Sequence, residues 1–274
     1  MNFYESGDIN NPVILLIPGT CCHYSLFNKV VPLLKEKFYT VVVSFDGFDE
    51  NEKTEYVSME EETIKIEKYI KENFNNHILC IYGCSLGGSF ASYLLQRNNI
   101  KVDHIILGSS DMDQSNKIIA SIKGKIIAPI MYKMIHTRKL PSFMQNKLDD
   151  MKINDTKRYN QMIEFLNSFM VSELQNVVTK KSIYNQYVSD LVTKIDKNIY
   201  NKNTTVHIFY ALKMGKKYRK RYLMHFKNPD IREQNMNHET FFFCHHLDWV
   251  DEVFDCVFSN WKFWSWFYQF SCII

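Results

Sequence analysis

The stretch His77-Ile-Leu-Cys-Ile-Tyr-Gly-Cys-Ser-Leu-Gly-Gly-Ser-Phe-Ala-Ser-Tyr-Leu-Leu95 decides the fold. An apolar run of strand type leads into Gly83-Cys84-Ser85-Leu86-Gly87, and a helical pattern follows at once. A sharp turn from strand to helix needs small residues beside its apex, and the glycines of the stretch supply them. Such a turn would hold Ser85 in a strained backbone conformation, with its hydroxyl exposed at the start of a helix.

Short apolar or β-branched runs alternate with longer helical patterns on both sides of this stretch. The alternation predicts an α/β fold, in which helices cover a mostly parallel sheet. The predicted strands are Val13–Ile17, Thr40–Phe45, Ile78–Tyr82, His104–Leu107, Val206–Tyr210 and, from a weaker pattern, Ile231–Asn235. Open α/β sheets place their chemistry in the loops at strand ends, so the residues after these runs are the first candidates for a site.

The strand pattern is absent from about Gln114 to Asn203, where apolar residues recur at helical spacing. We interpret residues 114–202 as a helical cap inserted into a core made of residues 1–113 and 203–274. Methionine and aromatic residues are frequent in this segment and could line an adaptable apolar pocket, although most of them are expected to pack within the cap.

The composition excludes several classes of protein. The chain has 274 residues, 46% of them hydrophobic, which is enough for a substantial core and rules out a disordered or fibrous protein. A net charge of +3 is too weak to indicate a nucleic-acid partner. No uncharged apolar run approaches the length of about 18 residues that a spanning helix needs, so membrane contact is not expected.

The N-terminus lacks the basic and apolar regions of an export signal, and the seven cysteines have no regular spacing. Both observations favour a cytoplasmic protein with free thiols. Cys21-Cys22 and His245-His246 are adjacent pairs without the spacing of a zinc site. We therefore expect no metal and no cofactor.

The strand, the Gly-x-Ser-x-Gly turn, the helix after it, the inserted helical segment and a late histidine together resemble the α/β-hydrolase family. The resemblance implies that Ser85 is a nucleophile on the family's nucleophile elbow. The Leu86 N–H and the helix dipole can stabilise an oxyanion there. By the same resemblance, Pro18-Gly19-Thr20 supplies the second donor, with the Thr20 N–H as the candidate and Cys21 second. The elbow geometry directs Ser85, and not Cys84, into the site.

The resemblance places the general base in the loop after the last strand, where His238 follows Asn235-Met-Asn. His245 and His246, at the start of the next helix, are the runners-up. The remaining histidines lie at strand starts or in a basic helical pattern, positions better suited to packing or capping than to proton transfer.

The position of the acidic residue that would orient His238 departs from the family's usual pattern. It normally follows the penultimate strand, yet no Asp or Glu occurs between Asp196 and Asp230. The basic run Lys213–Arg221 found there is expected to be a solvated helix face, or else to recognise a phosphate or carboxylate. Some family members carry the acid after the strand that follows the elbow, which makes Asp111 the candidate and Asp113 the second choice.

Either aspartate could instead cap the first cap helix. If neither serves, Ser85 and His238 would act as a dyad.

The expected function is that of a serine hydrolase that cleaves an acyl ester or thioester of a small, partly apolar substrate through an acyl-enzyme. The alternatives are an impaired hydrolase-like protein that binds a ligand or partner, and an acyltransferase or lyase on the same scaffold. The aromatic C-terminus, from Phe254 to Phe270, must be covered by the protein's own sheet or cap, by a second subunit in a homodimer, or, least favoured, by a membrane interface.

Overall fold

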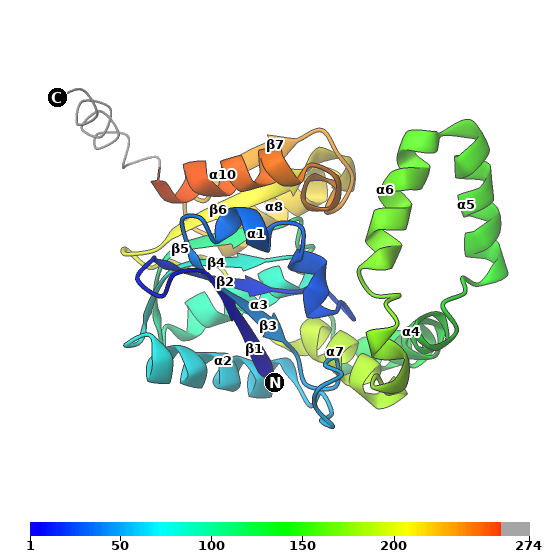
Figure 1. The fold of residues 1–274 in the computed structure, drawn as a ribbon, viewed down its shortest axis with the longest axis horizontal. Coiled ribbons are helices and arrows are strands. Elements are labelled where there is room, and N and C mark those ends of the chain that lie inside the picture. The colour runs from blue at the N-terminus through cyan, green and yellow to red at the C-terminus, as the bar shows by residue number, and fades with distance from the viewer. Residues whose placement is uncertain (259–274) are drawn as a thin grey trace.

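The computed structural model describes residues 1–258, and most of the aromatic C-terminus, from Trp261 onward, lies outside the described residues. A seven-stranded sheet with the order β1-β3-β2-β4-β5-β6-β7 forms the centre of the molecule (Figure 1). The strands are β1 Asn2–Ser6, β2 Val13–Ile17, β3 Tyr39–Ser44, β4 His77–Gly83, β5 Lys101–Leu107, β6 Thr205–Ala211 and β7 Asp230–Gln234. The predicted α/β fold with a mostly parallel sheet is confirmed.

The strand β1 is the exception to the parallel pattern. It pairs antiparallel with β3, with Phe3 opposite Val43. The sequence pattern did not predict it, because Asn2-Phe-Tyr-Glu-Ser is half polar, as suits an edge strand that is incompletely buried.

The side chains of the inner strands pack into two separate hydrophobic cores. In β2, Ile14 and Leu16 pack into one buried cluster, while Leu15 and Ile17 pack into the other. Side chains alternate across a strand, so a strand covered on both faces must be apolar throughout, which explains its continuous apolar run. The helices α1 and α10 lie on one face of the sheet, and α2 and α3 lie on the other (Figure 1).

Helices outside the cap connect the strands or follow the last of them. Ser58 caps the helix that begins at Met59, because its Oγ accepts the Glu61 N–H at 3.2 Å. The helices are η1 Tyr24–Phe27, α1 Val31–Leu34, α2 Met59–Asn73, α3 Leu86–Arg97, η3 Leu212–Met214, α8 Lys216–His225, α9 Thr240–Cys244 and α10 His246–Phe258.

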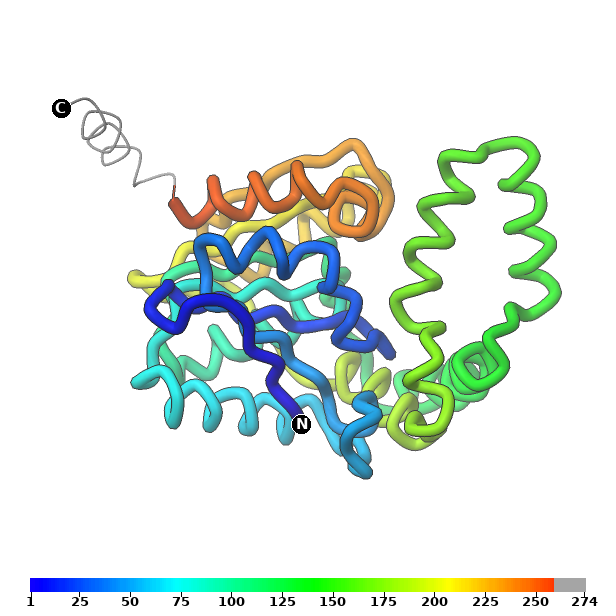
Figure 2. Tube along the Cα trace, viewed as in Figure 1, coloured from blue at the N-terminus to red at the C-terminus, as the bar shows by residue number. Residues whose placement is uncertain are grey.

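Between β5 and β6 the chain forms helices and no strand. These helices are α4 Lys117–Thr137, α5 Ser142–Asn154, α6 Thr156–Asn167, η2 Glu173–Asn176 and α7 Lys180–Val192. Figure 2 shows the α5–α6 hairpin, in green, standing beside the sheet. The helices α4 and α7 pack closely on each other: a Cβ added to Gly124 of α4 would collide with Val188 of α7. The predicted cap limits, 114 and 202, fall in the loops that flank these helices.

Two further expectations concern the described residues. All six cysteines within residues 1–258 are free thiols. In the same part of the chain, no helix combines the length and the apolar character needed to cross a lipid bilayer.

Candidate active site

Ser85 occupies the turn between β4 and α3, as the sequence predicts. Its φ of 49° lies in the left-handed region, which a non-glycine residue adopts only when its surroundings enforce it. A Cβ at Gly83 would collide with the carbonyl of Gly87, and a Cβ at Gly87 would collide with that of Ile17. The Gly-x-Ser-x-Gly spacing is therefore a steric requirement of this turn.

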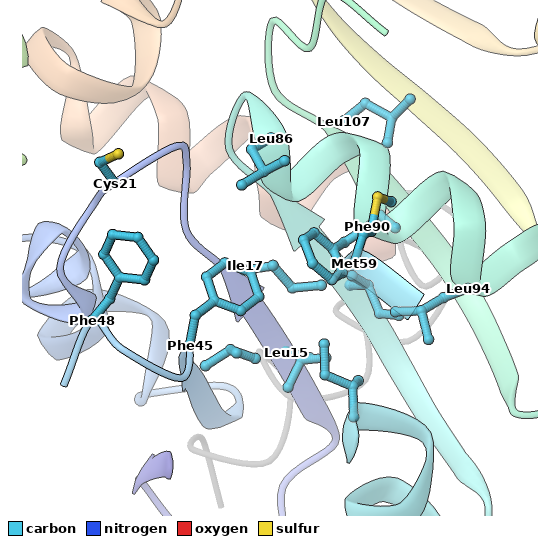
Figure 3. Close-up of a cluster of buried hydrophobic side chains, with 14 of the residues drawn as sticks. Leu15, Ile17, Cys21, Phe45, Phe48, Met59, Leu86, Phe90, Leu94 and Leu107 are labelled. Atoms are coloured by element: carbon cyan, nitrogen blue, oxygen red, sulfur yellow. The ribbon is translucent and has the colours of Figure 1, made fainter. Parts of the chain in front are cut away.

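Buried apolar side chains hold the helix beneath the turn. Leu86 and Phe90 of α3 belong to a cluster that also contains Ile17 of β2 and Phe45, which follows β3 (Figure 3). Phe90 and Phe45 are in ring contact, with centroids 4.8 Å apart. This packing fixes the start of α3, and with it the direction of the Ser85 side chain.

His238 meets Ser85 across the carboxyl edge of the sheet. Its Nε2 lies 3.1 Å from the Ser85 Oγ, which is hydrogen-bond distance. The loop that follows β7 supplies His238, and the backbone N–H of Lys213 braces this loop by donating to the carbonyl of Met236 at 3.1 Å. A serine hydroxyl that donates to the Nε2 of a neutral imidazole is prepared to lose its proton as it attacks.

The two runner-up histidines have other surroundings. His245 Nδ1 pairs with Asp248 at 3.6 Å, and the His246 ring contacts Phe242. Cys84 is the alternative to Ser85 as the nucleophile. It is buried, and burial raises the pKa of its thiol far above the usual range. A buried neutral thiol is a poor nucleophile.

The structure distinguishes between the two candidates for the second oxyanion donor. The N–H of Cys21 donates to Gln186 Oε1 at 2.7 Å. Among residues 1–258, the N–H groups of Thr20 and Leu86 have no acceptor. These two N–H groups, from the loop after β2 and from the first turn of α3, are therefore available for an oxyanion.

Two side chains in this region were not predicted from the sequence. Glu239, the residue after His238, is buried, and its Oε1 accepts the Ser85 N–H at 2.7 Å. Loss of solvation raises the pKa of the Glu239 carboxyl, and His238 opposes this rise. Gln186 of α7 is the second: it is fully buried and anchors Cys21. The sequence could have pointed to Glu239 through its position next to His238. It held no signal that pointed to Gln186.

Neither predicted acid is hydrogen-bonded to His238 within the described residues. The Asp111 carboxylate accepts the Asp113 N–H at 3.1 Å, and the Asp113 carboxylate pairs with Arg221 at 2.5 Å. The alternative interpretation, that one of them caps the first cap helix, is wrong. Asn116 caps α4, because its Oδ1 accepts the Ile119 N–H at 2.9 Å.

Two arginines of the basic run Lys213–Arg221 form ion pairs with other residues of the chain. Arg221 pairs with Asp113, as described, and Arg219 pairs with Glu233 at 3.0 Å on a half-exposed surface. The other alternative for this run, recognition of an anionic group on a substrate, stays a prediction.

Among residues 1–258, one group of side chains could hold a metal ion. Ligand atoms of His207, Asp230 and Cys256 lie within 4.8 Å of one another. His207 and Asp230 stand at the starts of β6 and β7, at the opposite edge of the sheet from Ser85. The Asp230 carboxylate already accepts hydrogen bonds from Arg232 and faces His207, so a cation there would have to compete with a guanidinium.

Comparison with known proteins identifies the family of this chain. The family model for the alpha/beta hydrolase fold matches residues 12–151, which is half of the chain. The chain belongs to the α/β-hydrolase fold family. The matched segment includes both the elbow and the Thr20 loop, which are the characteristic loops of an α/β hydrolase.

Several solved structures are similar to this chain in fold. An α/β-hydrolase family protein from Desulfitobacterium hafniense is 16% identical, with a TM-score of 0.72 over 92% of this chain and 98% of that one. A hydrolase from Pseudomonas aeruginosa is 8% identical, with a TM-score of 0.68 over 92% of each chain. The type II thioesterase of the borrelidin biosynthetic cluster is 10% identical, with a TM-score of 0.63 over 93% and 97%.

At these identities the likeness concerns the fold. No curated protein matches this α/β hydrolase by sequence.

A partly buried carboxyl near the elbow predicts a pH effect on stability. Burial and repulsion from Asp111 raise the pKa of Asp190 on α7 to about 7, far above its ordinary value of 3.8. Between about pH 4 and about pH 7 the folded chain therefore keeps a proton that the unfolded chain releases, so stability falls as the pH rises through this interval.

We expect Asp190→Asn to weaken this pH dependence. The melting temperature of the parent should fall more than that of the variant between about pH 5 and about pH 8. The parent should lose about 1 kcal/mol more unfolding free energy than the variant over this interval, or still more. This corresponds to a difference of roughly 3 °C in melting temperature. Thermal unfolding followed by circular dichroism measures it, and equal slopes in the two proteins would contradict a raised pKa at Asp190.

Proposed function

We propose that this α/β hydrolase is a serine hydrolase that cleaves an acyl ester or thioester of a small, partly apolar substrate. The observation that carries the proposal is the 3.1 Å approach of His238 Nε2 to the Oγ of Ser85 on a strained elbow. Within residues 1–258 the N–H groups of Thr20 and Leu86 have no acceptor, which supports acyl transfer because its intermediate is an oxyanion.

In the proposed reaction, the Ser85 Oγ attacks the carbonyl carbon while its proton passes to His238 Nε2. The carbonyl oxygen, now negative, accepts hydrogen bonds from the Thr20 and Leu86 N–H groups. The intermediate collapses as His238 returns the proton to the leaving alcohol or thiol, which departs and leaves an acyl-enzyme on Ser85. Water, deprotonated by His238, repeats the sequence and releases the acid.

A cavity in the cap supports the proposal that the substrate carries an apolar acyl group. It measures about 290 Å³ and is lined by apolar side chains of the α5–α6 hairpin, among them Met144, Leu148 and Leu166. Flexible methionines adapt to ligands of different shape. The purified protein should hydrolyse nitrophenyl esters, with a preference for apolar acyl chains over acetate. A folded protein that cleaves none of these esters, nor the matching thioesters, would contradict the proposal.

Asp111 stays the predicted acid. The proposal requires its carboxylate to leave the Asp113 N–H and reach His238 Nδ1 when substrate binds. Asp111→Asn should then lower kcat by up to about 10⁴-fold, as in serine proteases. Asp113→Asn, the matched control, should stay close to the parent. Near-parental rates for both variants would remove Asp111 from the mechanism and leave a dyad.

A binding protein without catalysis is the second candidate. The contacts of Asp111 and Asp113 favour it, because neither carboxylate is in place to orient His238 within the described residues. In that case Ser85 would not react with an active-site probe, although the fold and the elbow would be intact.

A further inference from the structure

The outer face of α4 carries exposed isoleucines. Ile118, Ile122 and Ile126 are 74%, 56% and 58% exposed, and Ile119 beside them is 46% exposed. Residues four apart lie on the same side of a helix, so these four form one apolar strip, which we name the α4 stripe. The opposite side of α4, with Ala120, Gly124 and Ala128, is buried. The stripe is therefore a second apolar face that the fold leaves uncovered.

Lysines border the α4 stripe on both sides. Helical geometry places Lys125 on one flank and Lys123 on the other, and Lys133 continues the face toward the end of α4. These lysines are exposed, and none of them forms an ion pair within residues 1–258. The sequence holds no Asp or Glu between Asp113 and Asp149. The surface is thus both apolar and strongly cationic.

We propose that the α4 stripe docks on an anionic lipid membrane, with α4 lying parallel to the surface. An interfacial helix of this kind inserts its apolar face at the headgroup boundary, while its lysines attract anionic lipids. Membrane docking is a property separate from hydrolysis. The sequence-based expectation of no membrane contact rested on spanning helices and the C-terminus alone, and not on an interfacial helix.

Charge argues against a second copy of this chain as the occupant. In a twofold dimer through the α4 stripe, each copy would present Lys123 and Lys125 to the same lysines of its partner. Like charges brought together in this way oppose association. An anionic lipid surface complements both the isoleucines and the lysines.

The surface also lies on the catalytic side of the molecule. The helix α4 follows the loop after β5, which leaves the same edge of the sheet as the Ser85 elbow after β4. Docking through α4 would therefore hold the cap, and not the far edge of the sheet, against the membrane.

Vesicle sedimentation of the full chain tests the proposal. The protein should bind phosphatidylcholine vesicles that contain about 30 mol% phosphatidylserine, bind vesicles of phosphatidylcholine alone far more weakly, and be released by salt. Lys123→Gln/Lys125→Gln should weaken binding about fivefold for each lysine, or about twenty-five-fold in all. Ile118→Ser/Ile122→Ser/Ile126→Ser should weaken it at least about tenfold.

Matched controls come from exposed residues elsewhere on the protein. Ile9→Ser/Ile64→Ser/Leu247→Ser replaces three exposed apolar side chains, and Lys101→Gln/Lys202→Gln removes two exposed charges. The first control should bind like the parent, and the second should lose less than the α4 charge variant. Ser85→Ala should also bind like the parent, which separates docking from catalysis.

Three outcomes would overturn the proposal. They are absence of binding to anionic vesicles, equal binding by the α4 variants and the parent, and a dimer in light scattering that the isoleucine variant dissociates. The last result would assign the α4 stripe to a second copy of the chain. Because the substituted isoleucines, leucine and lysines are all exposed, the melting temperatures of these variants should be unchanged, which confirms that they are folded.

Discussion

Ser85→Ala should lower kcat/KM for a nitrophenyl ester by about 10⁵-fold or more, because it removes the atom that forms the acyl-enzyme. In a serine protease, loss of the nucleophile costs about as much as loss of the whole triad. The fold should survive, since alanine adopts the same backbone conformation as serine and, within residues 1–258, the Ser85 Oγ bonds to His238 alone.

Ser92→Ala is the matched control for this variant. Ser92 lies on the same helix and is buried, and its Oγ donates to the Gly88 carbonyl at 2.6 Å inside the helix. Its rate should stay within about threefold of the parent, with at most a small loss of stability. Full activity in folded Ser85→Ala protein would show that another group performs the chemistry.

His238→Ala should lower kcat/KM by about 10⁴-fold or more. Without the imidazole, the Ser85 hydroxyl keeps its proton at neutral pH and the leaving group receives none. The residual rate should come from the Thr20 and Leu86 N–H groups, which the substitution leaves in place. Rates with a series of leaving groups are informative, because poor leaving groups depend most on protonation.

His245→Ala and His246→Ala provide the contrast. Neither ring contacts Ser85, so both variants should keep rates within about threefold of the parent. A loss of activity in either variant that equals the loss in His238→Ala would move the base out of the loop after β7.

The sequence predicted the fold where burial controls the pattern. The strand β2 was predicted to the residue at Val13–Ile17, because both of its faces are covered and its run is wholly apolar. The strand β7 was predicted one residue too late, because Asp230-Ile-Arg-Glu-Gln alternates apolar and charged residues at the sheet edge. Edge strands such as β1 and β7 leave weaker patterns because water covers part of them.

The candidate site was predictable where backbone geometry fixes the side chain. The elbow places Ser85, and the loop after the last strand brings His238 to it. The orientation of Asp111 was not predictable, because a hydrogen bond with the N–H of Asp113 turns its carboxylate, and such local bonds depend on loop conformation.

Glu239 was missed for a similar reason. It has a φ of 53°, and this left-handed conformation accompanies the position of its carboxylate beneath the elbow, where it accepts the Ser85 N–H. A sequence pattern gives no indication that a non-glycine residue in a loop will adopt this conformation.

Labelling with a fluorophosphonate tests the central claim, an activated Ser85, most directly. The parent protein should form one covalent adduct, and peptide mass spectrometry should locate it on Ser85. His238→Ala should label far more slowly, and Asp113→Asn should label like the parent. A folded parent that stays unlabelled, or an adduct on a residue other than Ser85, would contradict the account.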